Sequence, residues 1–140
     1  MEGQSLCELK SQNNSKKFSK ETTSLILFHS LVALKAIHKA GIAHGDVTIM
    51  NLGVSKSVGK GRIIFFDFGC SIPLNPVSAR RDVSSLLMVT SLVSVENKSL
   101  NDCRDEFENN PGTTVEMLIE MVSEETMFDP ESPFDWEQLD

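Results

Sequence analysis

The stretch "HKAGIAHGDVTIMNLGV", residues 38–54, decides how this chain is interpreted. It places His44 and Asp46 directly behind an apolar helical pattern, with Asn51 five residues after the aspartate. A second stretch, "RIIFFDFGC", follows and puts Asp67 at the end of a strand pattern. A β-hairpin between the two stretches would bring their polar side chains together. The pair predicts a functional site built on two loops joined by one hairpin.

These side chains have the chemistry needed to transfer a phosphoryl group from a nucleotide. That reaction needs a carboxylate that orients the attacking hydroxyl and accepts its proton, and oxygen ligands that hold Mg²⁺ on the phosphates. Asp46, Asn51 and Asp67 supply these groups. The alternative interpretation is that Asp and Asn occur in these loops only because they stabilise turns.

The order of these residues resembles the protein-kinase superfamily. "H-G-D-x-x-x-x-N" followed by "D-F-G" is similar to that family's catalytic loop and magnesium loop. The resemblance implies that Asp46 is the catalytic base, that Asn51 and Asp67 bind Mg²⁺ and ATP, and that His44 packs beneath the loop. It also implies that Asp82, in "RRDVSSLL", begins the family's central helix and holds the catalytic loop from below.

The resemblance covers about residues 1–95 and is limited to the C-terminal lobe of a kinase. "MEGQSLCELK" resembles the linker between lobes and the short helix that follows it. A complete kinase also has an upper lobe with a glycine-rich loop, a strand lysine and a helix glutamate. The residues before Glu21 are too few and too polar for such a lobe, and no G-x-G-x-x-G occurs. We therefore expect a mainly α-helical, kinase-like C-lobe with a small β-hairpin, lacking the N-lobe.

Hydrophobic spacing predicts the elements of this lobe. The expected helices cover residues 21–40, 82–94, 100–110 and 113–125, and the expected strands cover residues 52–54 and 62–67. Gly41 is expected to end the first helix in the left-handed conformation. Asp82 is expected near the N-terminus of the second helix, where a carboxylate is favoured, and Thr113 with Glu116 predicts a capping box for the last. Two segments are expected to be loops, residues 11–20 and 71–80.

Three positions depart from the usual kinase pattern. Gly45 lies at the position where regulated kinases carry an arginine that binds the phosphate of a phosphorylated activation loop. Only a dozen residues separate Gly69 from Asp82, so regulation by activation-loop phosphorylation is not expected. Together with Thr48 in place of the usual lysine, this resembles the small atypical kinases of the RIO and KEOPS-associated type. The KEOPS-associated kinases typically end in a basic tail, whereas this chain ends in an acidic one.

Gly53 and Cys70 carry two further expectations. Gly53 lies where family members usually present an apolar side chain as the floor of the adenine pocket. Its missing side chain removes ~1–2 kcal/mol of apolar contact. Binding of ATP and Mg²⁺ by this chain alone is therefore expected to be weak or absent, and Gly53→Leu is expected to restore nucleotide affinity. Cys70, directly after D-F-G, is interpreted as a small buried residue, with a reactive thiol near the phosphates as the alternative.

Charge is distributed unevenly along the chain, whose net charge is −7. Residues 1–104 hold 13 basic and 8 acidic residues, whereas residues 105–140 hold 12 acidic residues and no Lys or Arg. We divide the chain accordingly into a kinase-like core and an acidic helical extension that packs on the same domain. Phe128, Phe134 and Trp136 are expected to dock the end of the extension. An acidic tail repels phosphate, so no nucleic-acid partner is expected.

Composition and cysteine use suggest where the protein works. Hydrophobic residues make up 40% and charged residues 24% of the chain, as in ordinary globular proteins. No apolar run approaches the ~20 residues that cross a bilayer, and the N-terminus has no secretory pattern. Cys7, Cys70 and Cys103 show no C-x-x-C spacing, so neither zinc nor a disulfide is expected. An intracellular protein, cytoplasmic or nuclear, without a membrane partner is predicted.

Four functions remain open. The first is an ATP-dependent kinase that transfers the γ-phosphoryl group to a protein Ser or Thr, of which this chain is the lower lobe. The second is a non-catalytic module that modulates another kinase, because a missing lobe would leave an apolar surface for a protein partner to cover. A small-molecule kinase with similar loops and a truncated gene product are the others. Whether this chain alone is active stays open.

Overall fold

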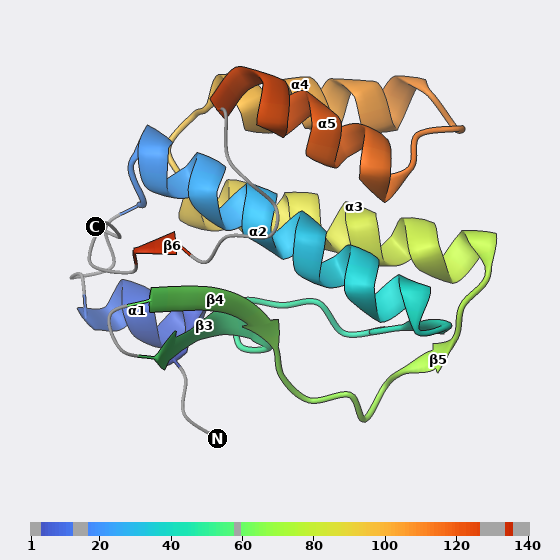
Figure 1. The fold of residues 1–140 in the computed structure, drawn as a ribbon, viewed down its shortest axis with the longest axis horizontal. Helices are drawn as coiled ribbons and strands as arrows, with labels where there is room; N and C mark the ends of the chain where they lie inside the picture. The colour runs from blue at the N-terminus through green and yellow to red at the C-terminus, as the bar shows by residue number, and fades with distance from the viewer. Residues whose placement is uncertain (1–3, 13–16, 58–59, 127–133, 136–140) are drawn as a thin grey trace.

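The computed structural model describes residues 4–12, 17–57, 60–126 and 134–135 (Figure 1). The helices are α1 (Leu6–Gln12), α2 (Lys20–Lys39), α3 (Pro76–Val93), α4 (Lys98–Asn109) and α5 (Val115–Thr126). The strands are β1 (Gln4–Ser5), β2 (Ile42–Ala43), β3 (Leu52–Ser57), β4 (Lys60–Phe65), β5 (Ile72–Pro73) and β6 (Phe134–Asp135). The described residues are mostly helical.

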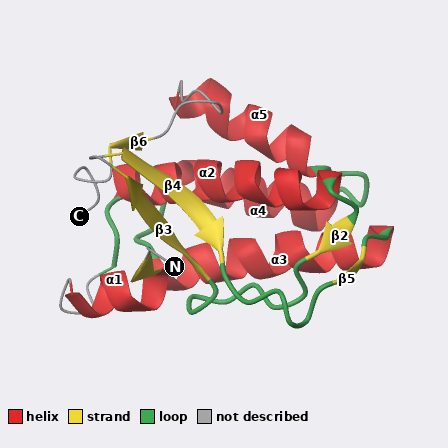
Figure 2. Cartoon of the chain, turned by 60° about the horizontal axis from the view of Figure 1, so that its bottom comes forward, coloured by secondary structure: helices red, strands yellow, loops and turns green. Residues whose placement is uncertain are grey.

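Two small antiparallel sheets connect parts of the chain that are far apart in sequence. The larger sheet has the order β1-β3-β4-β6, so segments near both chain ends pair with the two edges of the β3–β4 hairpin. Its register pairs Leu52 with Phe65 and Ser5 with Gly53. The smaller sheet pairs β2 with β5. Figure 2 shows the β3–β4 hairpin in front of α2, with green loops running from its lower end toward β2 and β5.

Helix α2 lies at the centre of the molecule. It packs against α3, α4, α5 and strand β4, and Figure 1 shows α2 and α3 between the α4–α5 pair and the hairpin. Leu27, Leu31 and Leu34 of α2 are fully buried, together with Leu86 of α3 and Leu118 of α5. Each such side chain stabilises the fold by about 1.5–3 kcal/mol. No helix in the described residues is long and apolar enough to cross a membrane.

The first predicted helix and the predicted hairpin are confirmed. Ser19 caps α2 by accepting a hydrogen bond from the backbone N–H of Thr22 at 3.2 Å. Gly41 follows the helix with φ +87°, a conformation that costs glycine little. The strand boundaries differ from the prediction, because β3 continues to Ser57 and β4 covers Lys60–Phe65 instead of residues 62–67. A helix near residues 100–110 is confirmed as well, by α4.

The predicted loop over residues 71–80 is wrong, and so is the predicted start of the next helix at Asp82. Pro73 lies in β5, and Pro76 is the first residue of α3. Proline suits that position because the first N–H groups of a helix have no intrahelical acceptor. Asn75 caps the helix by accepting from the N–H groups of Val77 and Ser78, both at 2.9 Å. Asp82 is therefore a buried residue inside α3.

Two other boundaries differ from the sequence interpretation. Helix α1 reaches Gln12, so the expected loop over residues 11–20 is partly helical. The expected capping box at Thr113 is wrong, because Thr114 accepts the hydrogen bond from the N–H of Met117 at 3.2 Å. The hydroxyl of Thr113 instead donates to the carbonyl of Glu106 at 3.1 Å.

The acidic extension is helical in part. Helix α5 packs against α2, and residue 104, where the sequence was divided, lies inside α4. The division into 1–104 and 105–140 stays a prediction. Phe134 belongs to strand β6 and pairs with Gly61 of β4. Phe128 and Trp136 lie outside the described residues, so their docking also stays a prediction.

Candidate functional site

His44 is the buried centre of the loop between β2 and β3. Its side chain is fully buried, and its Nδ1 accepts a hydrogen bond from the backbone N–H of Asp46 at 3.1 Å. Its Nε2 lies 2.7 Å from the carbonyl oxygen of Phe66, which can only accept. Both ring nitrogens are thus held by backbone groups, which fixes the orientation of the ring. His44 joins the loop to the end of β4, and its ring lies 4.8 Å from that of Phe68.

Asp82 fixes the same loop from α3. Its carboxylate accepts hydrogen bonds from the backbone N–H groups of His44 at 2.7 Å and Gly45 at 3.0 Å. His38, in the last turn of α2, places Nε2 2.9 Å from the same carboxylate. Burial opposes the charged form, but these three donors outweigh it and hold the pKa of Asp82 below its ordinary value. The loop is therefore anchored on a buried carboxylate.

Gly45 is required by a close backbone approach. It has φ +86°, and a Cβ at this position would lie 2.3 Å from the carbonyl oxygen of Cys70. No side chain fits there without moving the segment that follows Asp67. An arginine at this position would therefore clash with the backbone of Cys70.

Asn51 orients Asp46. The Nδ2 group of Asn51 donates to both the backbone carbonyl and the carboxylate Oδ2 of Asp46, each at 3.0 Å. The carbonyl of Asn51 in turn accepts from the N–H of Phe66 at 2.7 Å. Asp46 is only half-buried, so its carboxylate is held in place and still reached by solvent. The structure thus brings two of the predicted site residues into direct contact.

Asp67 occupies a strained backbone position at the far end of the hairpin. Its φ is +54°, the only positive value among the described residues other than glycine. Such conformations cost free energy and cluster at functional sites. The side chain is exposed, and its Oδ1 accepts from the N–H of Gly69 at 3.1 Å. No hydrogen bond joins Asp67 to Asp46 or Asn51 in the described residues.

The donor atoms near these loops fit Mg²⁺ only as a partial site. Asn51 uses its Nδ2 group on Asp46, which leaves its Oδ1 as a ligand. Asp67 offers a carboxylate. Within the described part of the chain there is no group of three or more His, Cys, Asp or Glu able to hold a metal ion. Mg²⁺ typically keeps several waters and uses one or two carboxylates plus substrate phosphates, so these two residues are compatible with such an ion.

Gly53 is covered by strand β1. A Cβ at this position would lie 2.1 Å from the carbonyl oxygen of Gln4 and 2.7 Å from a ring carbon of Phe66. A leucine at this position would have to displace β1, and the expectation that Gly53→Leu restores nucleotide affinity stays a prediction. A contribution of the Gly53 backbone to a nucleotide site stays a prediction.

The cysteines differ in exposure. Cys70 is exposed, so its interpretation as a buried residue is wrong. Cys103 is buried, and burial raises the pKa of its thiol to about 12. All three cysteines are free of disulfides.

His38 also belongs to the site, although its sequence context does not indicate this. His38 lies in the last turn of α2 beside Lys39. A basic side chain is favoured there, because the C-terminal end of the helix dipole is negative. This local explanation accounts for His38 in the sequence, so nothing there predicts its contact with Asp82, which is 44 residues away. Only the packing of α2 on α3 brings the two side chains together.

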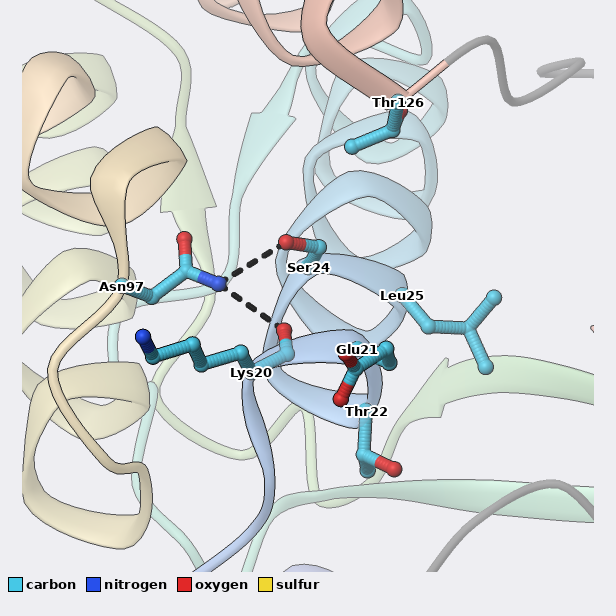
Figure 3. Close-up of a pocket in the computed structure, with 7 residues that line it drawn as sticks. All are labelled: Lys20, Glu21, Thr22, Ser24, Leu25, Asn97 and Thr126. Carbon is cyan, nitrogen blue, oxygen red and sulfur yellow. Dashed lines mark hydrogen bonds between the residues drawn. The ribbon is translucent and has the colours of Figure 1, made fainter.

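A separate pocket of about 390 Å³ contains none of the predicted site residues (Figure 3). It lies between the first turns of α2 and the residues that flank α4 and α5. Asn97 crosses it, donating from Nδ2 to the carbonyl of Lys20 at 2.8 Å and to Oγ of Ser24 at 2.9 Å. These bonds tie α2 to the start of α4, which is a structural role.

Comparison with known proteins supports the fold. Neither a protein-family model nor a curated protein sequence matches this chain. The structure is similar to a solved structure described as a divergent kinase lacking the glycine-rich loop, which regulates membrane ultrastructure of the Toxoplasma parasitophorous vacuole. The TM-score is 0.54 at 18% identity, over 79% of this chain and 45% of that one. This chain thus spans less than half the length of that kinase, and its fold is protein-kinase-like.

Proposed function

We propose that this chain is the C-terminal lobe of an atypical, RIO- or KEOPS-like protein kinase. In this proposal the lobe works with an N-lobe that this chain does not supply, and the protein phosphorylates Ser or Thr of a protein substrate with ATP and Mg²⁺. One observation carries the proposal. Asn51 holds the carboxylate of Asp46 at 3.0 Å, on a loop whose backbone is fastened to the buried carboxylate of Asp82.

Each residue then has a defined task. The carboxylate of Asp46 orients the substrate hydroxyl and accepts its proton as the hydroxyl oxygen bonds to the γ-phosphorus and ADP leaves. Oδ1 of Asn51 and the carboxylate of Asp67 hold Mg²⁺, which neutralises charge on the phosphates. His44 and Asp82 act as positioning residues, because they contact the loop and not the substrate. The strained backbone of Asp67 supports a functional role for this aspartate.

Metal binding can be tested on the chain as it stands. Mn²⁺, a paramagnetic substitute for Mg²⁺, is titrated into the ¹⁵N-labelled chain with ATP present, and amide line broadening is followed by NMR. Binding by this lobe alone should be weak, but paramagnetic broadening also detects weak binding. We therefore expect selective broadening around Asn51 and Asp67, and its loss in Asp67→Asn. The matched control is Asp105→Asn, an exposed acid of α4, which should leave the broadening unchanged. Broadening confined to α4 and α5, or retained in Asp67→Asn, would contradict the metal assignment.

Phosphoryl transfer is tested in the longest native protein that contains this chain. Asp46→Ala should abolish ³²P transfer from ATP to a Ser- or Thr-containing protein, because the hydroxyl loses its proton acceptor. Retention of the wild-type circular dichroism spectrum would show that the fold survives. Full activity in Asp46→Ala would contradict the assignment of this residue as the base.

The second candidate is a non-catalytic lobe that binds and modulates a kinase. Two observations favour it. Strand β1 covers Gly53 and leaves no room for an apolar side chain beneath an adenine ring. Met50 and Phe68, beside the loops, are 69% and 41% exposed. A chain that binds neither Mn²⁺ nor ATP, but forms a complex of fixed stoichiometry with a kinase, would support this role. A monodisperse chain that binds no kinase would contradict it.

A further inference from the structure

A groove of about 670 Å³ lies where the C-terminal end of α2, the N-terminal end of α3 and the α4–α5 turn meet. Figure 1 shows these three segments at the same end of the molecule, near β5. Neither Asp46 nor Asn51 nor Asp67 lines it. The groove is therefore a feature separate from the loops that carry the proposed chemistry.

The rim of the groove carries lysines that form no ion pair with any of the described residues. Lys35 and Lys39 lie one turn apart on α2, and both are exposed. Neither has an ion-pair partner within the described residues. Like charges spaced i and i+4 on a helix repel each other. The mutual repulsion of the two lysines is therefore relieved when an anion lies between them.

Arg80 adds a half-buried cation to the same groove. Its guanidinium donates to the carbonyls of Pro111 at 3.1 Å and Phe107 at 3.0 Å, and it lies 4.0 Å from the centre of the Phe107 ring. These contacts hold the side chain in place, but none of the partners is a carboxylate. Glu116 is the only acidic residue of the lining, and it forms no ion pair with Arg80 in the described part of the chain. A fixed, partly desolvated guanidinium of this kind attracts an anion strongly.

The walls of the groove are apolar. They include Leu74 and Pro76 ahead of and at the start of α3, Val83 within it, and Val115 at the start of α5. A small anion such as phosphate would gain nothing from these walls. A nucleic acid would also gain little from these walls, because it meets a protein surface mainly through its charged phosphates. A short peptide, in contrast, can place a hydrophobic side chain between the walls and its carboxylates on the rim.

We propose that this groove binds an acidic peptide segment of a partner protein. Lys35, Lys39 and Arg80 face its carboxylates, and the apolar walls receive one hydrophobic side chain. This docking site goes beyond phosphoryl transfer and does not depend on it, because it uses no residue of the proposed catalytic loops. It gives the chain a way to recognise a protein substrate or regulator through a surface away from the reacting groups.

The test uses a fluorescein-labelled synthetic peptide, EELEELFEE, and fluorescence anisotropy with the full 140-residue chain. Lys35→Glu/Lys39→Glu should weaken binding by at least about tenfold, since two attractive ion pairs turn into repulsions. Lys35→Gln/Lys39→Gln should weaken it less. The control Lys17→Glu/Arg104→Glu changes the net charge equally at two exposed sites outside the groove, and should change the affinity by less than about twofold. Circular dichroism verifies that every variant is folded.

Two further probes separate the alternatives. The peptide EESEESSEE keeps the charge but lacks apolar side chains, and KKLKKLFKK reverses the charge. We expect both to bind at least about tenfold more weakly than EELEELFEE, because each lacks one of the two interactions. Equal weakening by the groove and control variants would overturn the proposal in favour of general electrostatics. Equal binding of EESEESSEE, or full displacement by millimolar inorganic phosphate, would overturn it in favour of a simple anion site.

Discussion

At the scale of single residues, Asp82 is the side chain that joins the loop carrying Asp46 to both α2 and α3. One carboxylate accepts from His38 on α2 and from two consecutive N–H groups of the loop that carries Asp46. The sequence pattern predicts Asp82 near the start of a helix, where the helix dipole alone would account for a carboxylate. Its actual position, buried within α3, instead requires donors from outside the helix, because a buried charge without partners would be very unfavourable.

Replacing Asp82 with Asn tests how much this anchor contributes. We expect Asp82→Asn to lower the free energy of unfolding at pH 7 by about 3 kcal/mol, because an amide NH₂ would face N–H donors and leave some unsatisfied. Urea denaturation measures the change. Asp105→Asn, an exposed control, should change the free energy of unfolding by less than about 0.5 kcal/mol. Equal effects of the two substitutions would contradict the role of Asp82 as an anchor.

The same residue predicts a pH dependence. The pKa of Asp82 is lower in the folded chain than its ordinary value, so the unfolded chain takes up a proton at a higher pH than the folded one. The stabilisation is therefore fully present above the ordinary aspartate pKa of about 4, and is lost as the pH falls through the folded value. In Asp82→Asn the free energy of unfolding should fall less steeply below pH 4 than in the wild type. An unchanged slope would contradict this assignment.

At the scale of elements, the sequence predicted what local periodicity can specify. The apolar stripe of α2 and the glycine after it predicted that helix almost to the residue, and the glycines of "SKSVGKG" between two short apolar segments predicted the hairpin. The strands β1, β5 and β6 have two residues each. Two residues are too few to show any period, and such strands exist only through pairing with distant partners. Pro76 misled the prediction of α3 because proline also marks loops.

Strand β1 imposes the glycine at position 53, and Gly53→Ala tests this. A Cβ there would lie 2.1 Å from the carbonyl oxygen of Gln4. The variant should lose about 1–3 kcal/mol of stability in urea denaturation, as overpacked positions do. The amide of Cys7, which follows β1 and donates to the carbonyl of Ile49 at 3.0 Å, should exchange faster with D₂O. Gly112→Ala is the control, because its nearest contact, Oδ1 of Asn110, is at 3.4 Å. Loss of stability in Gly53→Ala without faster exchange at Cys7 would contradict the displacement of β1.

At the scale of the whole molecule, the loops and the groove differ in how far the sequence could reveal them. Asp46 and Asn51 are five residues apart, so their contact falls within reach of a short motif. The groove combines residues 35–39, 74–83 and 107–116, which only the packing of α2, α3, α4 and α5 brings together. No local pattern in any of these segments predicts a cation without a counter-ion. The motif thus indicated the candidate chemistry, while the candidate docking surface required the fold.

His38 connects the two regions, because it lines the groove and hydrogen-bonds Asp82 beneath the loop. Occupation of the groove should therefore be sensed at the loop. In ¹H–¹⁵N NMR spectra, saturating EELEELFEE should shift the amides of His44 and Gly45, whose N–H groups bind the Asp82 carboxylate. The shift reports a change in those hydrogen bonds, since neither amide belongs to the groove.

Two variants separate binding from coupling. His38→Ala should still bind the peptide within about threefold of the wild-type affinity, because the lysines remain, but the peptide should no longer shift His44 and Gly45. Lys35→Ala should bind more weakly, yet at saturation it should produce the full shifts, because His38 still contacts Asp82. If His38→Ala leaves the peptide-induced shifts intact, the coupling runs through other contacts between α2 and α3. If the wild type shows no shift at the two amides, the groove and the loop are energetically independent, because a ligand influences a second site only through a difference it creates there.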